Sequence, residues 1–297
     1  MKNKVHFIIN SRLDKALTEL SKQLSLDPFW QETHDCFLWQ SLYKGHALEL
    51  TQKAIHDQTS LVIACGGDGT INEIARYLAD TSIPLGIIPL GSGNGIARHF
   101  KIPLNIKGAL AVIREKHAVV MDAGLANQHF FLSNMGVSFD SEFINTYQTR
   151  RTRGFISYFK AFFIAIKHHK TQSFVVSHAG IKKEVSPFLL MISNANQFGY
   201  NFSLTPKALV SDGQFELILF KSKSIWSLFK LFLASRFGLK LSDKLLEIIP
   251  ISEVVIESAT KEFLIQLDGE TNRVSNEHLQ IKMHPTGLHV IVPAEHR

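Results

Sequence analysis

A glycine-rich segment between an apolar strand and a helix constrains the fold of this chain more than any other feature. The run Leu61–Cys65 is apolar at every position, as expected of a parallel strand that is covered on both faces. The sequence GGDGTINE follows at residues 66–73, and apolar side chains then recur with helical spacing up to Leu78. A strand, a tight turn and a helix in this order predict one repeat of an open, mostly parallel α/β sheet.

The alternation of strands and helices extends over the N-terminal part of the chain and then stops. Val5–Ile9 and Leu85–Ile88 are also apolar runs, and apolar residues between positions 47 and 55 share one helix face. Beyond Asp122, short apolar runs recur between turn residues, which is typical of an antiparallel sandwich or barrel. At roughly 150 residues per domain, the length of 297 residues predicts two domains. We therefore expect an α/β N-terminal domain with a mostly parallel sheet over residues 1–122, and a mainly antiparallel, β-sandwich-like C-terminal domain over residues 123–297.

Composition and charge exclude several classes of protein. Hydrophobic residues make up 45% of the chain and charged residues 20%, which allows a sizeable core and excludes a disordered or collagen-like protein. The two cysteines, Cys36 and Cys65, exclude a disulfide scaffold and a Cys-based zinc finger. No signal peptide and no membrane-spanning run is present, so we expect a cytoplasmic protein.

The net charge of +6 fits an anionic partner such as a nucleotide, a nucleic acid or lipid headgroups. Basic residues do not alternate with aromatic ones as a nucleic-acid platform requires, so nucleic acid is not expected as a partner.

The glycines of the first loop fit a phosphate-binding backbone. Amides at the start of a helix carry partial positive charge and donate hydrogen bonds to phosphate oxygens. Gly66, Gly67 and Gly69 would let that backbone approach a ligand closely. Asp68 would then lie at the carboxyl end of a strand, where α/β folds bind ligands. The alternative for part of the motif is structural, since residues 70 and 73 have the spacing of a helix capping box.

A second glycine loop, Pro89–Arg98, follows the third predicted strand. It does not fit the dinucleotide pattern G-x-G-x-x-G, because position 96 is isoleucine. The P-loop pattern G-x-x-x-x-G-K-[ST] does not occur anywhere in the sequence. Two glycine loops at neighbouring strand ends predict one nucleotide that lies across both.

Five segments, in the same order as in a known family, carry a resemblance. Gly66–Glu73 matches a GGDGT-x-NE motif, Pro89–Arg98 matches P-x-G-[ST]-x-N, and Leu267–Glu270 matches a late D-G-E motif. Ser41–Ala47 is similar to a T-x-x-x-G-[DH]-A nucleotide segment with Ser in place of Thr, and Asn194–Leu217 is similar to a second-domain signature. By these segments the chain resembles the diacylglycerol kinase and sphingosine kinase family of lipid kinases, in its compact bacterial form.

The resemblance implies an activity and a set of nucleotide-binding residues. The activity is an ATP-dependent lipid kinase that phosphorylates a hydroxyl of a diacylglycerol-like or sphingoid-like lipid, with ATP and Mg²⁺ as cofactors. The nucleotide-binding residues that it implies are Asn10, Ser41, Gly66, Gly67, Asp68, Gly69, Thr70, Asn72, Glu73, Gly91, Ser92, Gly93 and Asn94.

Two departures from the family pattern stand out. After the first strand, only Asn10 remains of the usual N-P-x-[SA]-G loop, so one contact to the nucleotide is lost or supplied differently. Gly95 stands where many bacterial diacylglycerol kinases carry an aspartate of their metal–water network. The second departure weakens the case for diacylglycerol as the substrate in particular.

The resemblance also implies catalytic and metal-binding residues. Asp68 and Glu270 are the two candidates for the base that accepts the hydroxyl proton. Without the resemblance, Asp268-Gly269-Glu270 would be interpreted as a hairpin turn.

For the metal-binding residues, Asp122 resembles a member of an acidic cluster, or else it is a turn residue. Asp212 resembles the acid of a peripheral metal site that main-chain oxygens of Leu209 and Gln214 complete, or else Asp212-Gly213 is only a turn.

Two segments, residues 154–168 and 224–239, have an apolar helical pattern with basic residues at their ends. Each is either a helix buried against the sheet of the second domain, or a helix that meets lipid. With the net positive charge, the second interpretation predicts peripheral contact with a lipid substrate at the membrane surface. Whether the chain forms a homodimer is left open.

Two alternative functions are retained. One is an NAD kinase-like enzyme with a soluble substrate, and the other is a nucleotide-binding regulatory protein with impaired catalysis.

Overall fold

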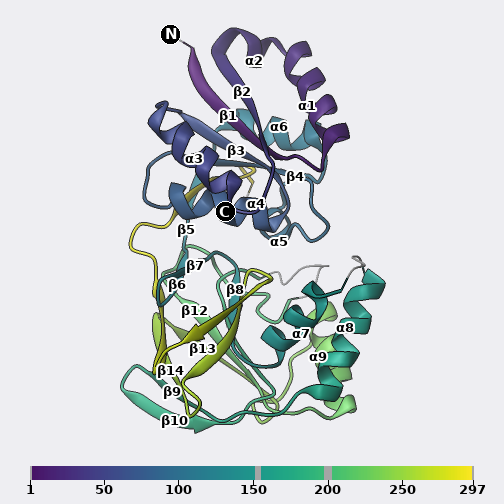
Figure 1. Ribbon diagram of the computed structural model, residues 1–297, viewed down its shortest axis with the longest axis vertical. Helices are drawn as coiled ribbons and strands as arrows, with labels where there is room; N and C mark the ends of the chain where they lie inside the picture. Colours follow the sequence, from purple (N-terminus) through teal and green to yellow (C-terminus); the bar gives the residue numbers. More distant parts are fainter. Residues whose placement is uncertain (1, 151–154, 197–202, 296–297) are drawn as a thin grey trace. The chain divides into compact units, whose positions relative to one another are not determined.

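The computed structural model describes residues 2–150, 155–196 and 203–295. The chain divides into two compact units: unit 1 contains the chain up to Met121 together with the segment from Pro285 onward, and unit 2 is Asp122–His284. The boundary expected after residue 122 therefore lies one residue away from the observed one. The assignment of the whole C-terminal part to the second domain is wrong for the last segment, which returns to unit 1 (Figure 1).

Unit 1 is an α/β layer structure around the six-stranded sheet A (Figure 1). The strands follow the order β2 (His34–Ser41), β1 (Asn3–Asn10), β3 (Leu61–Gly66), β4 (Leu85–Pro89), β18 (Leu288–Ile291) and β5 (Ala118–Met121). The first five are parallel to their neighbours, and only β5 is antiparallel, to β18. The mostly parallel sheet that the sequence predicts is confirmed.

Helices cover both faces of sheet A. They are α1 (Asp14–Leu26), α2 (Pro28–Thr33), α3 (His46–His56), α4 (Asp68–Leu78), α5 (Gly95–His99) and α6 (Ile106–Glu115). Helix α3 packs against α4, whereas α1 packs against α2 and α6. Because crossover connections between parallel strands are right-handed, the steps from β1 to β2 and from β3 to β4, which run in opposite directions, place α1 and α4 on opposite faces. Every residue of β3 is buried, as the uninterrupted apolar run predicts.

The segment after Pro285 joins sheet A for physical reasons that its sequence shows only in part. Leu288 and Val290 are fully buried in the core of unit 1. A turn with Gly287 at φ 67° precedes them, and the Thr286 hydroxyl donates to the carbonyl of Ala79. The apolar run that forms β18 is one of the strands expected beyond Asp122. Its pairing partners, however, are more than 160 residues earlier in the chain.

Unit 2 is a sandwich of two six-stranded sheets whose strand pairings are antiparallel throughout. Sheet B has the order β10 (Ile181–Val185), β9 (Phe174–His178), β14 (Glu253–Ser258), β17 (His278–Met283), β6 (Gly124–Ala126) and β7 (His129–Phe131). Sheet C has the order β13 (Leu246–Ile251), β12 (Phe215–Phe220), β11 (Leu189–Ser193), β8 (Asn134–Gly136), β15 (Glu262–Leu267) and β16 (Glu270–Ser275). The expected antiparallel, sandwich-like domain is confirmed.

Two hydrophobic cores hold unit 2 together. The first lies between the sheets and contains side chains such as Phe131, Leu217 and Ile256. The second lies between sheet C and the helices α7 (Phe139–Gln148), α8 (Phe155–His168) and α9 (Ile225–Phe237), which Figure 1 shows on one side of the sandwich. Both helices expected at residues 154–168 and 224–239 are present, although Gly154 lies outside the described residues. Among the described residues, no helix is long and apolar enough to cross a bilayer.

Candidate nucleotide and catalytic sites

The sequence motifs of unit 1 gather at one edge of sheet A. Asn10, Ser41, Gly66 and Pro89 are the last residues of β1, β2, β3 and β4, and these four strands are neighbours. Because the strands are parallel, their carboxyl ends lie at the same edge. The strand order also reverses between β1 and β3, and open α/β sheets bind ligands outside the carboxyl ends of the strands at such a point.

The two glycine loops are packed backbone against backbone. A Cβ atom on Gly91 would lie 2.5 Å from the Cα of Gly67, and one on Gly67 would lie 3.1 Å from the Cα of Gly91. A Cβ atom on Gly66 would lie 2.5 Å from the Oγ1 of Thr70. Gly67 and Gly91 are therefore required by the close approach of the two loops, and Gly66 by the side chain of Thr70, independently of any ligand.

The second loop is held in shape by its own side chains. Asn94, which has φ 52° and is almost fully buried, accepts a hydrogen bond from the amide of Gly91 at 2.9 Å. Its Nδ2 atom donates in turn to the carbonyl of Gly91 at 2.8 Å. The Arg98 Nε atom donates to the carbonyl of Gly93 at 3.0 Å. The side chain of Asn94 thus has a structural role in this loop.

Asp68 connects the first loop to the second. It lies in the first turn of α4, and its Oδ1 atom accepts a hydrogen bond from the amide of Ile96, in the first turn of α5, at 3.4 Å. A Cβ atom on Gly93 would lie 3.0 Å from the other carboxylate oxygen, Oδ2. Burial raises the pKa of Asp68, and the backbone amides of residues 94–96 partly oppose that rise. A carboxylate with a raised pKa is a better proton acceptor near neutral pH.

The capping-box interpretation of residues 70 and 73 is wrong. Helix α4 begins at Asp68 with Gly67 as its N-cap, so Thr70 is already inside the helix. The Glu73 Oε1 atom instead accepts a hydrogen bond from the amide of Gly45 at 2.9 Å. Gly45 has φ 90° and caps the start of α3, after the segment that follows β2. Glu73 thus joins the β2–α3 connection to α4.

The turn after β1, where the sequence departs from the family's N-P-x-[SA]-G loop, has a defined local structure. The Oδ1 atom of Asn10 accepts a hydrogen bond from the amide of Arg12 at 3.0 Å, and the carbonyl of Asn10 accepts from Leu13 at 3.0 Å. The amide of Ser11 donates to the carbonyl of Ser41 at 2.9 Å, which ties the ends of β1 and β2 together. Asn10 therefore shapes the turn into α1.

The late D-G-E motif of unit 2 is a hairpin turn, as its sequence alone suggests. Asp268 and Gly269 join β15 to β16 with φ 48° and 85°, and both values are typical of a type I′ turn. The carboxylate of Asp268 has a second function, because it accepts hydrogen bonds from the amides of Leu132, Ser133 and Asn134 at 2.7, 2.7 and 3.0 Å. Glu270 is the first residue of β16 and is partly buried.

Two glutamines fix the position of this turn further, and sequence reasoning missed both. The Gln266 Oε1 atom accepts from the amide of Gly269 at 2.9 Å, and its Nε2 donates to the Oδ1 of Asn134 at 2.7 Å. Gln148, in α7, donates to the carbonyl of Gly269 at 2.9 Å and accepts from the hydroxyl of Thr271 at 2.8 Å. Gln266 lies in β15 and is almost fully buried. A polar residue within this apolar strand was the sequence signal that could have identified it.

A buried carboxyl group lies behind this turn, in α7. Asp140 is 5% exposed, and its Oδ2 atom is buried without a hydrogen-bond partner among the described residues. A Cβ atom on Gly136 of β8 would lie 1.5 Å from that oxygen, so only glycine fits there. Burial raises the pKa of Asp140 to about 7, although hydrogen bonds from Ser138 and Gln266 oppose the rise.

The residues expected at a metal site form a group of carboxylates in unit 2. The Asp122 Oδ2 atom accepts from the amide of Gly213 at 2.8 Å, and the Asp212 Oδ1 atom accepts from the amide of Gln214 at 3.1 Å. Burial raises the pKa of Asp122, and the negative charge of Asp212 adds to the rise. Glu216, missed from the sequence, has its pKa raised to about 7 by burial and by Asp212. Asp122 and Asp212 are therefore brought together, with Gln214 beside them in the same turn.

Oxygen donors of this kind suit Mg²⁺ or Ca²⁺. The Oε2 atom of Glu216 is buried without a hydrogen-bond partner in the described part of the chain, which fits a donor for such a cation. However, no three acidic, His or Cys side chains among the described residues are arranged to hold a metal ion by themselves. A metal here would need main-chain oxygens, such as those of Leu209 and Gln214.

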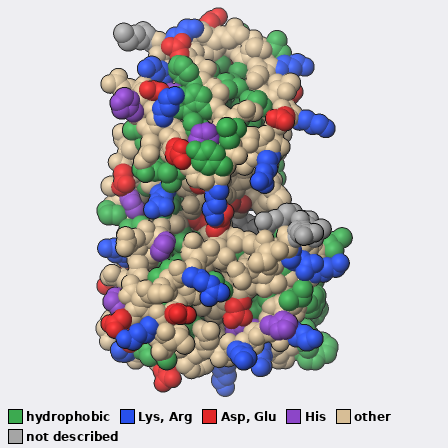
Figure 2. Space-filling model, viewed as in Figure 1, with side chains coloured by type: hydrophobic (Ala, Val, Ile, Leu, Met, Phe, Trp, Pro, Cys, Tyr) green, Lys and Arg blue, Asp and Glu red, His purple; other side chains and the backbone are tan. Residues whose placement is uncertain are grey.

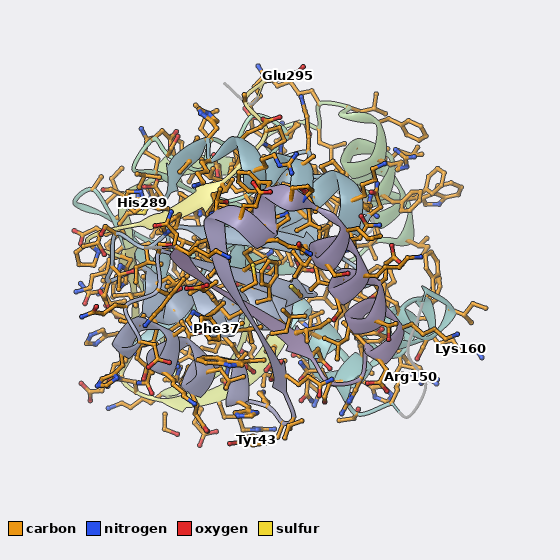
Figure 3. All side chains as sticks on the ribbon, turned by 90° about the horizontal axis from the view of Figure 1, so that it is seen from above. Phe37, Tyr43, Arg150, Lys160, His289 and Glu295 are labelled. Atoms are coloured by element: carbon orange, nitrogen blue, oxygen red, sulfur yellow. The ribbon has the colours of Figure 1, made fainter. Side chains whose placement is uncertain are left out.

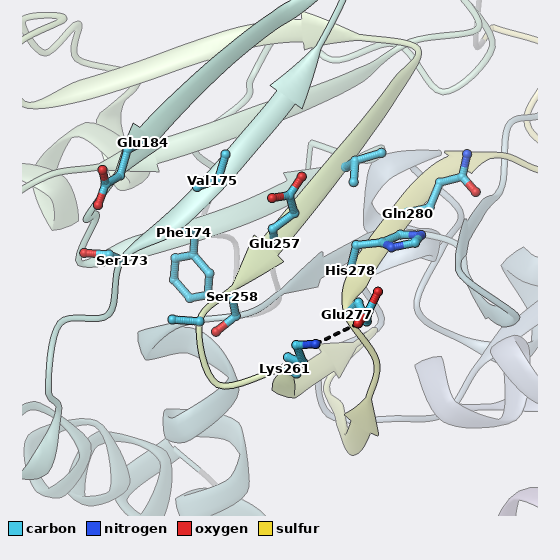
Figure 4. Close-up of a pocket in the computed structure, with 12 residues that line it drawn as sticks. Ser173, Phe174, Val175, Glu184, Glu257, Ser258, Lys261, Glu277, His278 and Gln280 are labelled. Atoms are coloured by element: carbon cyan, nitrogen blue, oxygen red, sulfur yellow. Dashed lines mark hydrogen bonds and ion pairs between the residues drawn. The ribbon is translucent and has the colours of Figure 1, made fainter.

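A pocket within unit 2 lies elsewhere. It has a volume of about 670 Å³ and lies over sheet B, where Glu184, Glu257, His278 and the Lys261–Glu277 ion pair line it (Figure 4). None of the motif residues lines this pocket. We therefore do not assign the reaction to it.

Comparisons with known proteins match both parts of the chain to known domains. Residues 4–126 match the diacylglycerol kinase catalytic domain, and residues 137–292 match the YegS C-terminal NAD kinase beta sandwich-like domain. Proteins named "Probable lipid kinase YegS-like" from Yersinia pestis (strain Pestoides F) and Yersinia pseudotuberculosis serotype O:1b (strain IP 31758) are each 30% identical over 257 residues, which is 84% of this chain and 84% of theirs.

Solved structures show the same fold. A "putative diacylglycerol kinase" from Bacillus anthracis str. Sterne has a TM-score of 0.80 at 24% identity, over 99% of this chain and 98% of that one. A second structure from the same organism, with the same description, has a TM-score of 0.78 at 25% identity over 99% of both chains. The matched domains, their order and the similarity to these relatives establish that the chain belongs to the YegS-like lipid kinase family, with a diacylglycerol kinase-type catalytic domain.

Proposed function

We propose that this protein is an ATP-dependent lipid kinase that transfers the γ-phosphoryl group to a hydroxyl of a diacylglycerol-like or sphingoid-like lipid. The observation that carries the proposal is the pair of glycine loops at the carboxyl edge of sheet A, with Asp68 between them. Membership of a lipid kinase family supports the substrate class. Gly95 replaces the aspartate that many bacterial diacylglycerol kinases carry at this position. The proposal therefore names both lipid types and not diacylglycerol alone.

The start of α4 supports a binding site for the nucleotide phosphates. This helix has 11 residues, and its N-cap, Gly67, supplies no side-chain hydrogen bond to the first-turn amides. Those amides are therefore suited to donate to phosphate oxygens, and the helix dipole favours the negative charge. Glycines at positions 66, 67 and 69 add no side chains of their own to this turn, which supports a close approach of phosphate to its backbone.

When ATP is bound, Mg²⁺ would supply neutralisation of the phosphate charge. The carboxylate of Asp68 is the group in this loop that could hold the ion. For the separate group in unit 2, Asp212 would hold a peripheral cation together with the main-chain oxygens of Leu209 and Gln214. The crowding of Asp122, Asp212 and Glu216 supports that assignment, because a cation would relieve their mutual repulsion.

Asp68 and Glu270 remain the two candidates for the base that accepts the proton from the acceptor hydroxyl. Asp68 has a raised pKa, which favours proton transfer near neutral pH. Glu270 follows a turn whose backbone is fixed by Asp268, Gln266 and Gln148, and a base must be held in a defined position to act. The raised pKa thus supports Asp68 as the base, and the fixed turn supports Glu270.

The activity test uses ATP labelled in the γ-phosphate, Mg²⁺ and a total lipid extract in detergent micelles. We expect label in the organic phase, and none in NAD offered in parallel. NAD belongs in the test because unit 2 matches a domain described as NAD kinase-like. Label in NAD alone would replace the lipid kinase proposal with a soluble-substrate kinase, and label in neither would favour a regulatory protein.

A further inference from the structure

Helix α8 is apolar on the face that it buries and also on the face that it exposes. Ala161 and Ala165 point inward and are buried against the second core of unit 2. The outward stripe at i, i+3, i+7 and i+8 is nevertheless apolar, and its side chains are between 40% and 72% exposed: Ile156, Phe159, Phe163 and Ile164. An amphipathic surface helix would carry polar residues at these positions. The sequence left open whether this helix is buried against the sheet or meets lipid. In the structure, α8 has one apolar face that is buried and a second apolar face that is exposed.

Helix α9 repeats this arrangement on the same side of sheet C. Leu228 and Ala234 are buried, and Leu228 belongs to the same core as the buried residues of α8. Its outward apolar residues are between 39% and 73% exposed: Ile225, Trp226, Phe229, Phe232 and Phe237. Scattered exposed hydrophobic residues are normal, but two helices that pack on one core and both carry apolar outward faces call for a partner.

The charges among these apolar residues all have one sign. Neither helix contains an Asp or Glu. Lys160 and Lys167 lie on the exposed side of α8, and Lys230 and Arg236 lie on the exposed side of α9. No ion pair in the described ranges involves these four side chains. Figure 2 shows green and blue side chains intermixed at the lower right of the view, and Lys160 projects outward in Figure 3.

We infer that the outward faces of α8 and α9, the α8–α9 face, dock onto a bilayer that contains anionic lipids. Apolar side chains would enter the boundary between headgroups and acyl chains, and Lys and Arg would contact the headgroup phosphates. Trp226, at the first turn of α9, is of the type enriched at such boundaries. A second copy of the protein is a poorer occupant, because the positive charges on the α8–α9 faces of the two copies would repel each other. The inference rests on the proposed function for its purpose, since docking brings the enzyme to its substrate.

The test is vesicle flotation without nucleotide, so its result does not depend on catalysis. Vesicles of phosphatidylcholine with phosphatidylglycerol should bind the wild-type protein, and pure phosphatidylcholine vesicles should bind it much more weakly. The double variant Trp226→Ser/Phe229→Ser should lose about tenfold in affinity per side chain removed. Lys160→Glu/Lys167→Glu should weaken binding mainly at low salt, because surface charges are screened as salt rises.

Matched controls exist on other surfaces of the chain. Ile181 in β10 and Leu26 in α1 are 57% and 70% exposed, so Ile181→Ser/Leu26→Ser removes similar apolar area elsewhere. Lys22→Glu/Lys107→Glu makes the same charge change on unit 1. Both control variants should bind like the wild type. Equal binding by the α8–α9 variants and their controls would overturn the inference.

Two further readouts distinguish insertion into a bilayer from association with a second copy. Brominated lipids should quench the fluorescence of Trp226, and Trp226→Phe should abolish that quenching, since Trp30 is buried and Trp39 lies in β2 of unit 1. Unchanged fluorescence on vesicle binding would contradict insertion. Light scattering should give the same mass for the wild type and Trp226→Ser/Phe229→Ser, whereas a dimer that these substitutions dissociate would assign the face to a second copy. Absence of lipid phosphorylation in detergent micelles would count against the proposed function alone.

Discussion

Replacing Asp268 by alanine tests whether the late hairpin turn is anchored by its first residue. The substitution removes three hydrogen bonds that the amides of residues 132–134 donate to one carboxylate, and two of these amides belong to the buried residues Leu132 and Ser133. Hydrogen bonds to a charged group contribute about 1.5–3 kcal/mol each, and an unpaired buried amide is costly. Because the three bonds share one carboxylate and their losses are not additive, we expect a loss of about 3–5 kcal/mol of unfolding free energy.

The chain offers an internal control for the backbone of that turn. Ala179 and Gly180 join β9 to β10 with φ 46° and 77°, nearly the same conformation as Asp268 and Gly269. Alanine is thus accommodated at this turn position, and the cost of Asp268→Ala reports mainly on the lost carboxylate. Ala179→Asn should change stability little, since Asn tolerates this conformation. Asp268→Asn keeps one acceptor oxygen and should lose about half as much as Asp268→Ala.

Urea denaturation measures these differences as shifts in the midpoint at constant slope. If Glu270 acts from this turn, Asp268→Asn should also lower kcat while the KM for ATP stays near the wild-type value. A loss below about 1 kcal/mol for Asp268→Ala would refute the anchoring argument. A lower kcat without any loss of stability would place Asp268 in the reaction itself.

Three further predictions concern the loops and the buried acids. Gly91→Ala should abolish nucleotide binding, because its Cβ atom would lie 2.5 Å from the backbone of Gly67; isothermal titration with ATP checks this, and unchanged affinity would contradict the loop packing. Asp68→Asn and Glu270→Gln should each keep the fold. Loss of the residue that acts as the base should lower kcat by roughly 10²–10⁴-fold. Added Mg²⁺ should partly restore the activity of Asp68→Asn and not that of Glu270→Gln. Near-normal turnover in both variants would show that neither is the base.

The third of these predictions is a pH dependence of stability. Since burial raises the pKa of Asp140 to about 7, the folded protein keeps this proton while the unfolded chain ionises from about pH 4 upward. The stability is fully present below the unfolded pKa and falls as the pH rises toward 7. Between pH 5 and pH 8 this fall is about 2–3 kcal/mol, and Asp140→Asn should flatten it in urea denaturation at these two pH values. An unchanged difference between the two pH values would contradict it.

Much of the fold could be predicted because local patterns coincide with global burial. The run Leu61–Cys65 is apolar throughout, and the strand that it forms is buried on both faces. Strand β2 was not anticipated, because it lies at the edge of sheet A and its sequence HDCFLWQS mixes polar and apolar residues. Strand β18 was anticipated as a strand but placed in the wrong unit, since sequence patterns do not encode pairing over more than 160 residues.

The candidate sites were predictable where a motif is contiguous and not where contacts are long-range. The glycines and Asp68 were found because they follow one strand directly. The bond from Gly45 to Glu73, and the three amides held by Asp268, join residues 28 to 136 positions apart. Local spacing suggested a helix cap for Glu73, and the tertiary contact replaced it.

The central claim is most directly tested by the transfer of label from γ-labelled ATP to lipid. The wild-type protein, supplied with Mg²⁺ and detergent-solubilised diacylglycerol or sphingoid base, should release a phosphorylated lipid into the organic phase. The double variant Asp68→Asn/Glu270→Gln, verified as folded by its denaturation midpoint, should release none above background. Equal labelling by the two proteins, or label confined to the aqueous phase with either lipid, would contradict the claim.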